Sequence, residues 1–485
     1  MLFWILIVLA WLFFILGSIA NLQIVWSLFK ANKGQHTSSM VPLVPGLVGS
    51  LAVYFTLPQL SRWGYEASSP LLWIFLPLIL DIGTLPYFVL ACFGMIKQVV
   101  SSKEGIARVP FLRYSRQRPK IESAPFSKEP AITGCILGTA VGDAMGLACE
   151  GLSREKQMKM FPKLAGYKFL PFGKGMTSDD SEHTCMVAQS LIETTGYVNA
   201  DAFAKKFASN FGWRLRFWLL GLPAGIGSAT LRAILKLWIG FTARASGVFS
   251  GGNGPAMRVA LIGVCYGADA PRLQALVRAA TRVTHTDPRA EHGAMGIALA
   301  AHLAAQGQGP IDPQKYRELL AARMGSDAIE LIKIVDEVIV SVVSGEPASV
   351  YAERIGCGNG ITGYIYHTVP IALHVWLRHH SDYREAVLKT VRLGGDTDTV
   401  AAIVGALVGA RVGVEGIPSE WLRDLWEWPR TKEWMKRLGT RLAEHVDQET
   451  CGGNLPLNPL KLFLRNIIFL SIVLAHGFRR LLVRS

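Results

Sequence analysis

The hydrophobic positions of this chain form three long apolar stretches near its start and many shorter, periodic segments afterwards. Residues 2–29 carry no charged side chain and exceed the ~20 residues that cross a bilayer core. Residues 41–60, which contain prolines, and residues 70–96, which contain Asp81, are two further apolar stretches. The pattern therefore predicts about three transmembrane helices within a membrane anchor of residues 1–97.

The charges beside these stretches predict their orientation. Lys30 and Lys33 follow the first stretch, and a basic run that begins at Lys97 follows the third. Because basic loops stay on the cytoplasmic side, we expect an integral membrane protein, of a bacterial inner membrane, whose later residues lie in the cytosol. Asp81 is either a functional acid within the membrane or lies in a polar gap where the helix breaks near Gly83 and Pro86. The lack of a basic partner in the other stretches favours the break.

The rest of the chain divides into three parts. Residues 98–130 are basic, polar and proline-containing, which is typical of a linker, and residues 131–450 are long enough for a soluble domain. Residues 451–485 form a basic tail whose uncharged run, Asn466 to Phe478, is short for a membrane span. We expect this tail to be an amphipathic helix that lies on the membrane surface.

Apolar residues between 131 and 450 recur at helical spacing, and strand-like alternation is scarce. An all-α fold is therefore the natural class. The segments with a helical pattern are residues 182–194, 201–211, 270–280, 290–305, 327–343 and 383–391.

Residues 131–149 are apolar enough to imitate another membrane span, but glycine recurs there at every fourth position. Such a stripe lets a neighbouring helix approach closely, and residues 399–414 repeat it. Asp143 and Glu150 are seven residues apart, which predicts that both carboxylates share one face of the same helix. GxxxG spacing also occurs in membrane dimers, but these acids favour a tightly packed soluble bundle. The glycines are Gly134, Gly138, Gly142 and Gly146, then Gly405, Gly409 and Gly413.

Charge and cysteine content narrow the class of protein. The net charge is +14, but the basic residues gather beside apolar stretches and no nucleic-acid-binding motif accompanies them, so we expect a membrane and no nucleic acid as partner. The seven cysteines include no CxxC pair. This pattern suits a reducing cytosol and excludes a disulfide framework or a zinc site.

Two short clusters combine carboxylates with hydroxyl groups directly before a predicted helix: Thr177–Ser181 and Gly394–Thr399. Such hard oxygen ligands suit Mg²⁺ or Mn²⁺. Either cluster alone is equally well explained as a helix N-cap. Together with Glu150 they bring several carboxylates into one bundle, which requires a cation. Two metal ions roughly 3.5–4 Å apart would balance them.

Two glycine- or histidine-containing loops are candidate substrate sites. Residues 250–254 offer backbone amides before a helix, suitable for a diphosphate, although a turn without a ligand has the same pattern. Residues 283–289 place His285 and Asp287 at a helix start, where Asp287 followed by Pro288 also reads as a cap. A third glycine-rich loop, 356–360, carries no assignment alone.

The order of these motifs resembles the ADP-ribosylglycohydrolase family, which includes the dinitrogenase reductase-activating glycohydrolases. The motifs are GDAMG followed by Glu150, then SDDSEHT, GNGPAMR, THTDPRA and GGDTDT, and the resemblance covers residues 131–429. It implies an orthogonal all-α bundle with two Mg²⁺ or Mn²⁺ ions in a central cleft. It also implies hydrolysis at the anomeric carbon of an ADP-ribosyl group, carried by a protein or a small molecule. The implied metal ligands are Glu150, Ser178, Asp179, Asp180, Asp396, Asp398 and Thr399.

The resemblance further implies roles other than metal binding. One of Glu150, Asp179 and Asp398 would take the proton of the attacking water, and Asp143 would support the site without binding metal. The residues implied for binding ADP-ribose are Gly252, Asn253, Gly254, His285 and Asp287.

One position departs from the family pattern. Arginine-specific members often carry an acid in a Pro-x-Asp-Ile-Gly stretch, and here Gly225 stands at the acid position. This puts an arginine-linked substrate in doubt. The alternatives are a hydrolase of a free ADP-ribose derivative or of another linkage, and an ADP-ribose-binding sensor without turnover.

Overall fold

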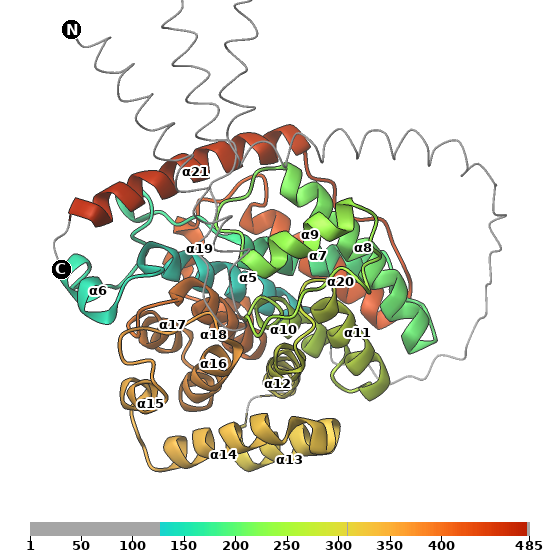
Figure 1. Ribbon diagram of the computed structural model, residues 1–485, viewed down its shortest axis with the longest axis horizontal. Coiled ribbons are helices and arrows are strands. Elements are labelled where there is room, and N and C mark those ends of the chain that lie inside the picture. The colour runs from blue at the N-terminus through green and yellow to red at the C-terminus, as the bar shows by residue number, and fades with distance from the viewer. Residues whose placement is uncertain (1–126, 308, 483–485) are drawn as a thin grey trace, which may run out of the picture. The chain divides into compact units, whose positions relative to one another are not determined.

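The computed structural model describes residues 127–307 and 309–482 (Figure 1). The predicted spans 2–29, 41–60 and 70–96, together with Asp81 and most of the predicted linker, lie outside these residues. Apart from Ser127 and Trp238–Gly240, the described residues belong to one compact unit.

The described unit is helical, and β-pairing within it is confined to isolated bridges. The expected all-α class is confirmed. The first helices along the chain are α5 (Glu129–Gly146), η1 (Leu147–Cys149), α6 (Arg154–Met160), η2 (Pro171–Gly173), α7 (Asp179–Ile192), α8 (Ala200–Leu220), α9 (Ser228–Trp238), α10 (Ala256–Tyr266), α11 (Ala270–Arg282) and α12 (Pro288–Ala305). The remaining helices are α13 (Pro313–Met324), η3 (Gly325–Ala328), α14 (Ile329–Val343), α15 (Ala348–Arg354), α16 (Ile365–His379), α17 (Tyr383–Val391), α18 (Thr397–Val412), η4 (Val414–Gly416), α19 (Ser419–Asp424), α20 (Lys432–Gln448) and α21 (Pro459–Leu482).

The helices predicted from periodicity are present. α7, α11, α12, α14 and α17 begin and end within a few residues of the predicted segments. α8 continues to Leu220 instead of ending at Phe211, because its apolar face extends through the buried Leu215 and Leu219. α16, which contains Pro370, was not predicted.

The centre of the unit is an antiparallel pair of glycine-rich helices, α5 and α18, with α7, α10 and α17 packed around them (Figure 1). A Cβ atom on Gly138 would lie 2.2 Å from the carbonyl oxygen of Gly405, and one on Gly142 would lie 2.1 Å from that of Ala401. The glycine stripe of α5 therefore packs against the glycine stripe of α18, so the close neighbour expected for the first stripe is the second. The α5 stretch is a buried core helix, as predicted.

One expectation about α5 is wrong. Its α-helix ends at Gly146 and is followed by η1, so Asp143 and Glu150 do not share a helical face. Asp143 is fully buried, whereas Glu150 is exposed at the end of η1. The chain turns here because Gly151 has a φ of 70° and donates its N–H to the carbonyl of Gly395 at 2.7 Å. Glu150 thereby reaches the neighbourhood of α18.

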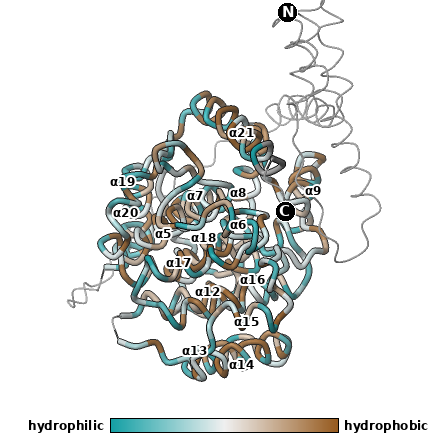
Figure 2. The backbone as a smooth tube through the Cα atoms, turned by 90° about the vertical axis from the view of Figure 1, so that its left-hand side faces the viewer, coloured by the Kyte–Doolittle hydropathy of each residue, from teal (hydrophilic) through white to brown (hydrophobic). Residues whose placement is uncertain are grey.

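The basic tail forms the two-sided helix α21, along which Figure 2 shows both hydrophobic and hydrophilic residues. Its length and composition would allow it to cross a membrane, but only 22% of its apolar window is buried within the protein. Its inner side packs on the unit through Arg465, Asn466, Phe469 and Leu470, which are all buried. Its outer side exposes Leu460, Phe463, Leu464, Ile467 and Ile468. Surface attachment of this helix stays a prediction.

Candidate metal centre

Three helix ends meet at the predicted acidic clusters: the end of α5 and the beginnings of α7 and α18. The pairing of α5 with α18 ends where a Cβ atom on Gly146 would lie 2.3 Å from the carbonyl of Thr397. Thr397 Oγ1 also donates to the carbonyl of Gly146 at 2.8 Å. Because Glu150 follows α5 and Asp396 to Thr399 begin α18, backbone contact between the glycine helices brings these parts of the candidate ligand set together.

Asp143 on α5 fixes the start of α7. Its two carboxylate oxygens each accept the N–H of Ser178 at 2.9 Å, and Oδ2 accepts both the N–H and the hydroxyl of Ser181, at 3.1 and 2.5 Å. Burial raises the pKa of Asp143 to about 6, although these hydrogen bonds favour the ionised form. Asp143 therefore anchors the acidic turn with oxygens that are already occupied.

Side-chain contacts join the two acidic clusters to each other. Asp180 Oδ2 accepts hydrogen bonds from Ser178 Oγ at 3.1 Å and from Thr399 Oγ1 at 3.3 Å. Asn253 Nδ2 donates to Asp396 Oδ2 at 2.6 Å, which connects the second cluster to the glycine-rich loop 250–254. These contacts join Ser178, Asp180 and Thr399 to one another, and Asp396 to the loop that carries Asn253.

Burial and mutual repulsion disfavour the ionised form of the carboxylates in this site. Burial raises the pKa of Asp180 well above its usual range, and the charges of Asp179, Asp143 and Asp396 raise it further. Burial does the same to Asp398, reinforced by Glu150 and Asp180. Asp179 is shifted in the same direction by burial and by neighbouring acids, Asp143 first. These groups repel one another unless a positive charge lies between them.

The donor set fits a divalent cation. Asp180 Oδ1 and Asp398 Oδ1 are buried and have no hydrogen-bond partner. Arginines pair with Glu182 and Glu427, but no ion pair among the described residues reaches Asp179, Asp180 or Asp398. Hard carboxylate and hydroxyl oxygens of this kind suit Mg²⁺ or Mn²⁺. Among the described residues, no group of three His, Cys, Asp or Glu side chains is arranged closely enough to hold a metal ion. The ligand set therefore stays a prediction.

Helix capping explains only part of the clusters. Ser178 is the N-cap of α7, and its hydroxyl accepts the N–H of Asp180 at 3.4 Å. Asp396 occupies the equivalent place before α18, but its side chain makes no capping hydrogen bond to that helix. Helix capping therefore explains the side chain of Ser178 but does not explain the side chain of Asp396.

The loop 250–254 differs from the expectation that its amides are open to a diphosphate. The N–H of Gly252 lies 3.3 Å from Ser250 Oγ, and the N–H of Asn253 donates to the carbonyl of Gly363 at 2.9 Å. The first contact lies within the loop, and the second arises because the loop pairs with the segment that leads into α16. What the loop presents to the metal centre is the side chain of Asn253.

His285 and Asp287 lie beside this loop, close to Gly252 and Gly251. His285 is buried, and a Cβ atom on Gly252 would lie 3.1 Å from its Nε2. Burial, reinforced by the charge of Arg258, lowers the pKa of His285 to about 3, so the ring is neutral. Asp287 caps α12 and forms an ion pair with Arg289 at 2.8 Å. Both lie next to the loop 250–254, each already has a protein partner, and their part in binding ADP-ribose stays a prediction.

Tyr364 is a neighbour of the site that sequence reasoning missed. A Cβ atom on Gly251 would lie 3.1 Å from the ring of Tyr364. The backbone of Tyr364 pairs with Gly252, and the Tyr364 hydroxyl accepts a hydrogen bond from Arg289 at 3.3 Å. The third glycine-rich loop, 356–360, packs against the start of the second acidic cluster, because a Cβ atom on Gly360 would lie 2.7 Å from the nitrogen of Gly395. A single tyrosine after a glycine carries no recognisable signal in one sequence.

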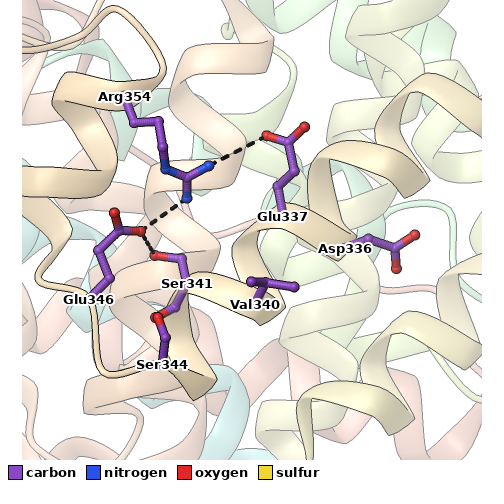
Figure 3. Close-up of a pocket in the computed structure, with 7 residues that line it drawn as sticks. All are labelled: Asp336, Glu337, Val340, Ser341, Ser344, Glu346 and Arg354. Carbon is purple, nitrogen blue, oxygen red and sulfur yellow. Dashed lines mark hydrogen bonds and ion pairs between the residues drawn. The ribbon is translucent and has the colours of Figure 1, made fainter.

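Gly225 and a surface pocket are two further features of the described residues. Gly225 is exposed, has a φ of 80° and has no atom within 4 Å of a would-be Cβ. The pocket, of about 470 Å³, is bordered by α14, α15 and the turn between them (Figure 3). Its acids Glu346 and Glu337 pair with Arg354 at 3.0 and 3.9 Å, and none of the predicted site residues lines it.

The comparison with known families agrees with the motifs. The sequence profile of the family "ADP-ribosylglycohydrolase" matches residues 126–451. The chain therefore belongs to the ADP-ribosylglycohydrolase family, and the expected resemblance is confirmed.

Several known proteins are similar to this chain over much of their own length. The chain is 32% identical to an uncharacterized protein of Archaeoglobus fulgidus over 322 residues, 65% of this chain and 97% of the relative. It is 28% identical to ADP-ribosylhydrolase ARH3 of Gallus gallus, covering 59% of this chain and 87% of the relative. It is 27% identical to ADP-ribosyl-[dinitrogen reductase] glycohydrolase of Rhodospirillum rubrum, covering 60% and 89%. A solved structure of an ADP-ribosylglycohydrolase-related protein complex shares 27% identity, covers 66% of this chain and 99% of that chain, and superposes with a TM-score of 0.47.

Proposed function

We propose that this protein is a divalent-metal-dependent hydrolase that cleaves the glycosidic bond of an ADP-ribosyl group. The observation that carries the proposal is the meeting of buried carboxylates at three helix ends, where Asp180 Oδ1 and Asp398 Oδ1 have no partner. Buried carboxylates that repel one another cost free energy unless a cation compensates them. Family membership supplies the reaction class that such a centre serves.

Two Mg²⁺ or Mn²⁺ ions are the proposed cofactors. When bound, they would neutralise the clustered acids, orient the ribose hydroxyls and lower the pKa of a water molecule. The residues proposed to hold them are Glu150, Ser178, Asp179, Asp180, Asp396, Asp398 and Thr399.

The exposure of the three candidate catalytic acids separates their roles. Glu150 is exposed and lies close enough to raise the pKa of both Asp179 and Asp398. It is therefore the acid best placed to take a proton from the attacking water, as the bond to the anomeric carbon breaks and positive charge develops there. Asp398 is 5% exposed and Asp179 is half-buried, which suits them to holding charge within the site.

Gly225 bears on the substrate. At this position the chain offers no carboxylate, and the backbone has a positive φ that side chains rarely adopt. A serine-linked or other O-linked ADP-ribosyl group, or a free ADP-ribose derivative, is therefore favoured over an arginine-linked group. The relatives named for ADP-ribosyl-[dinitrogen reductase] and ADP-ribosyl hydrolysis leave both kinds of substrate open.

We also propose that the protein works at a membrane, with its hydrolase domain in the cytosol. The apolar stretches before residue 97 supply the attachment. The outer side of α21 supports it, because Leu464, Ile467 and Ile468 are exposed on one stripe of the helix. Flotation with liposomes of anionic and of zwitterionic lipid would test this attachment, with no flotation in either contradicting it.

The experiment that tests the function uses the full chain in detergent with a panel of substrates. The panel contains an ADP-ribosyl-serine peptide, an ADP-ribosyl-arginine peptide and free ADP-ribose conjugates, each incubated with Mg²⁺ or with a chelator. We expect Mg²⁺-dependent release of ADP-ribose, faster from the serine peptide than from the arginine peptide. Binding of ADP-ribose without release from any substrate would replace the hydrolase with a sensor.

A further inference from the structure

Arg465 lies beyond residues 126–451, which the family profile matches, yet it reaches the acidic centre. Its side chain is 2% exposed. Its Nη2 atom donates to the carbonyl oxygen of Thr177 at 2.5 Å, and Thr177 directly precedes Ser178. A residue of the C-terminal helix α21 is thus a direct neighbour of the turn that carries the first acidic cluster.

Glu427 completes this contact from the other side of Thr177. Arg465 donates from Nε and Nη2 to the two oxygens of Glu427 at 2.8 and 2.7 Å. Glu427 Oε2 in turn accepts the N–H and the hydroxyl of Thr177, both at 3.1 Å. The backbone N–H and the carbonyl of Thr177 are therefore both held by one two-pronged ion pair, which fixes the orientation of the residue.

The charges of this region balance only when Arg465 is included. Glu182, on α7, accepts from Arg430 and from Trp218 at 2.5 Å, and its Oε1 lies 3.7 Å from Arg465 Nη1. Glu182 and Glu427 are thus two buried carboxylates that face two buried guanidinium groups. Loss of Arg465 would leave an extra negative charge beside a centre that is already acidic.

α21 is seated on the unit by contacts at other points as well. Asn466 Nδ2 donates to the carbonyl of Gly221 at 2.7 Å. Further along the helix, His476 Nε2 lies 2.6 Å from the carbonyl of Phe169 and its ring stacks on that phenylalanine. His476 therefore anchors the same helix on Phe169, a different point of the unit, which makes it a matched control for Arg465.

We propose that Arg465 is a positioning residue for the metal centre: it holds Thr177, and through it the turn 177–181, in the orientation that metal binding requires. The metal-binding consequence rests on the function proposed above.

The test compares Arg465→Ala, Arg465→Lys and His476→Ala in the full chain in detergent. Two quantities are measured: the dissociation constant of Mn²⁺ by electron paramagnetic resonance, and hydrogen exchange of the peptide that covers residues 177–181. Neighbours of metal ligands typically contribute about 10–100-fold to metal affinity. We expect Arg465→Ala to weaken Mn²⁺ binding to that extent and to speed exchange at 177–181. Arg465→Lys should recover part of the affinity, and His476→Ala should stay within about twofold of the native protein.

The outcomes separate this proposal from the proposed function. Native Mn²⁺ affinity and native exchange in a folded Arg465→Ala protein would overturn it, and so would an equal loss in His476→Ala. If Arg465→Ala does not fold, Arg465→Lys carries the same test, because a lysine cannot make the two-pronged contact. If the native protein binds no Mn²⁺, the proposed function fails, and faster exchange in the variant still supports the positioning of the turn.

Discussion

Asn253 Nδ2 lies 2.6 Å from Asp396 Oδ2, and this hydrogen bond ties the glycine-rich loop to the second acidic cluster. The same amide group also donates to Thr368 Oγ1 on α16 at 2.9 Å. Asn253 therefore sets the direction of a proposed metal ligand from within a proposed substrate loop.

Asn253→Ala should weaken both metal binding and turnover. Removal of the donor releases Asp396 to other orientations, so we expect about a tenfold loss in Mn²⁺ affinity and at least that loss in kcat/KM. Asn454→Ala changes an exposed asparagine and serves as the control. Native values for Asn253→Ala in both measurements would show that the contact does not orient the ligand.

Gly138→Ala tests the packing that brings the helix ends together. The added Cβ would lie 2.2 Å from the carbonyl oxygen of Gly405, so the helices must separate. We expect a loss of about 3 kcal/mol in the free energy of unfolding, even though alanine normally favours a helix by about 1 kcal/mol. Gly166→Ala, where nothing lies within 4 Å, is the control for denaturant unfolding. Equal stability of the two variants would refute the close contact.

Stabilisation by Mg²⁺ should increase with pH. Burial and neighbouring charges raise the pKa of Asp180 and Asp398 well above the usual range and that of Asp143 to about 6. The folded metal-free protein therefore keeps protons that the unfolded chain releases near pH 4, and its stability falls as pH rises through the folded pKa values. Because Mg²⁺ binds the ionised carboxylates, its gain in Tm should be several degrees larger at about pH 8 than at about pH 5.5. A gain that is independent of pH, or larger in acid, would mean that these carboxylates do not bind the metal.

Gly225→Asp should broaden the choice of linkage. The position has free space around it, and aspartate tolerates a positive φ better than most side chains. We expect a several-fold rise in release from the ADP-ribosyl-arginine peptide relative to the serine peptide. Gly225→Asn adds a side chain of similar size and similar tolerance of a positive φ without a carboxylate, and is the control. If both variants change the ratio equally, the acid is not the determinant.

The sequence predicted the elements of this fold better than their junctions. The four-residue spacing of Gly134, Gly138 and Gly142 identified a helix face for close packing, because a stripe of glycines has no other use in a helix. Periodicity could not reveal that α5 stops at Gly146, since that end depends on the contact of Gly151 with Gly395, far along the chain.

In the site, too, local sequence patterns predicted some residues, while residues placed by tertiary contacts could not be predicted. Motifs identified the acidic clusters, because carboxylates and hydroxyl groups before a helix are local patterns. The clamp on Thr177 could not be predicted, since Glu427 and Arg465 meet it only through tertiary packing. The tail was interpreted by its charge and hydropathy alone, and those properties describe its outer side while Arg465 belongs to its inner side.

The most direct test of the metal-dependent hydrolase is turnover by Asp396→Ala/Asp398→Ala in the full chain. The matched control is Asp201→Ala, which removes an exposed carboxylate from the first turn of another helix. At saturating Mg²⁺, the double variant should lose at least about a thousandfold in ADP-ribose release and bind no Mn²⁺, while the control matches the native protein. Native rates of Mg²⁺-dependent release by a folded double variant would contradict the account, because the carboxylates at the start of α18 would then not form the metal centre.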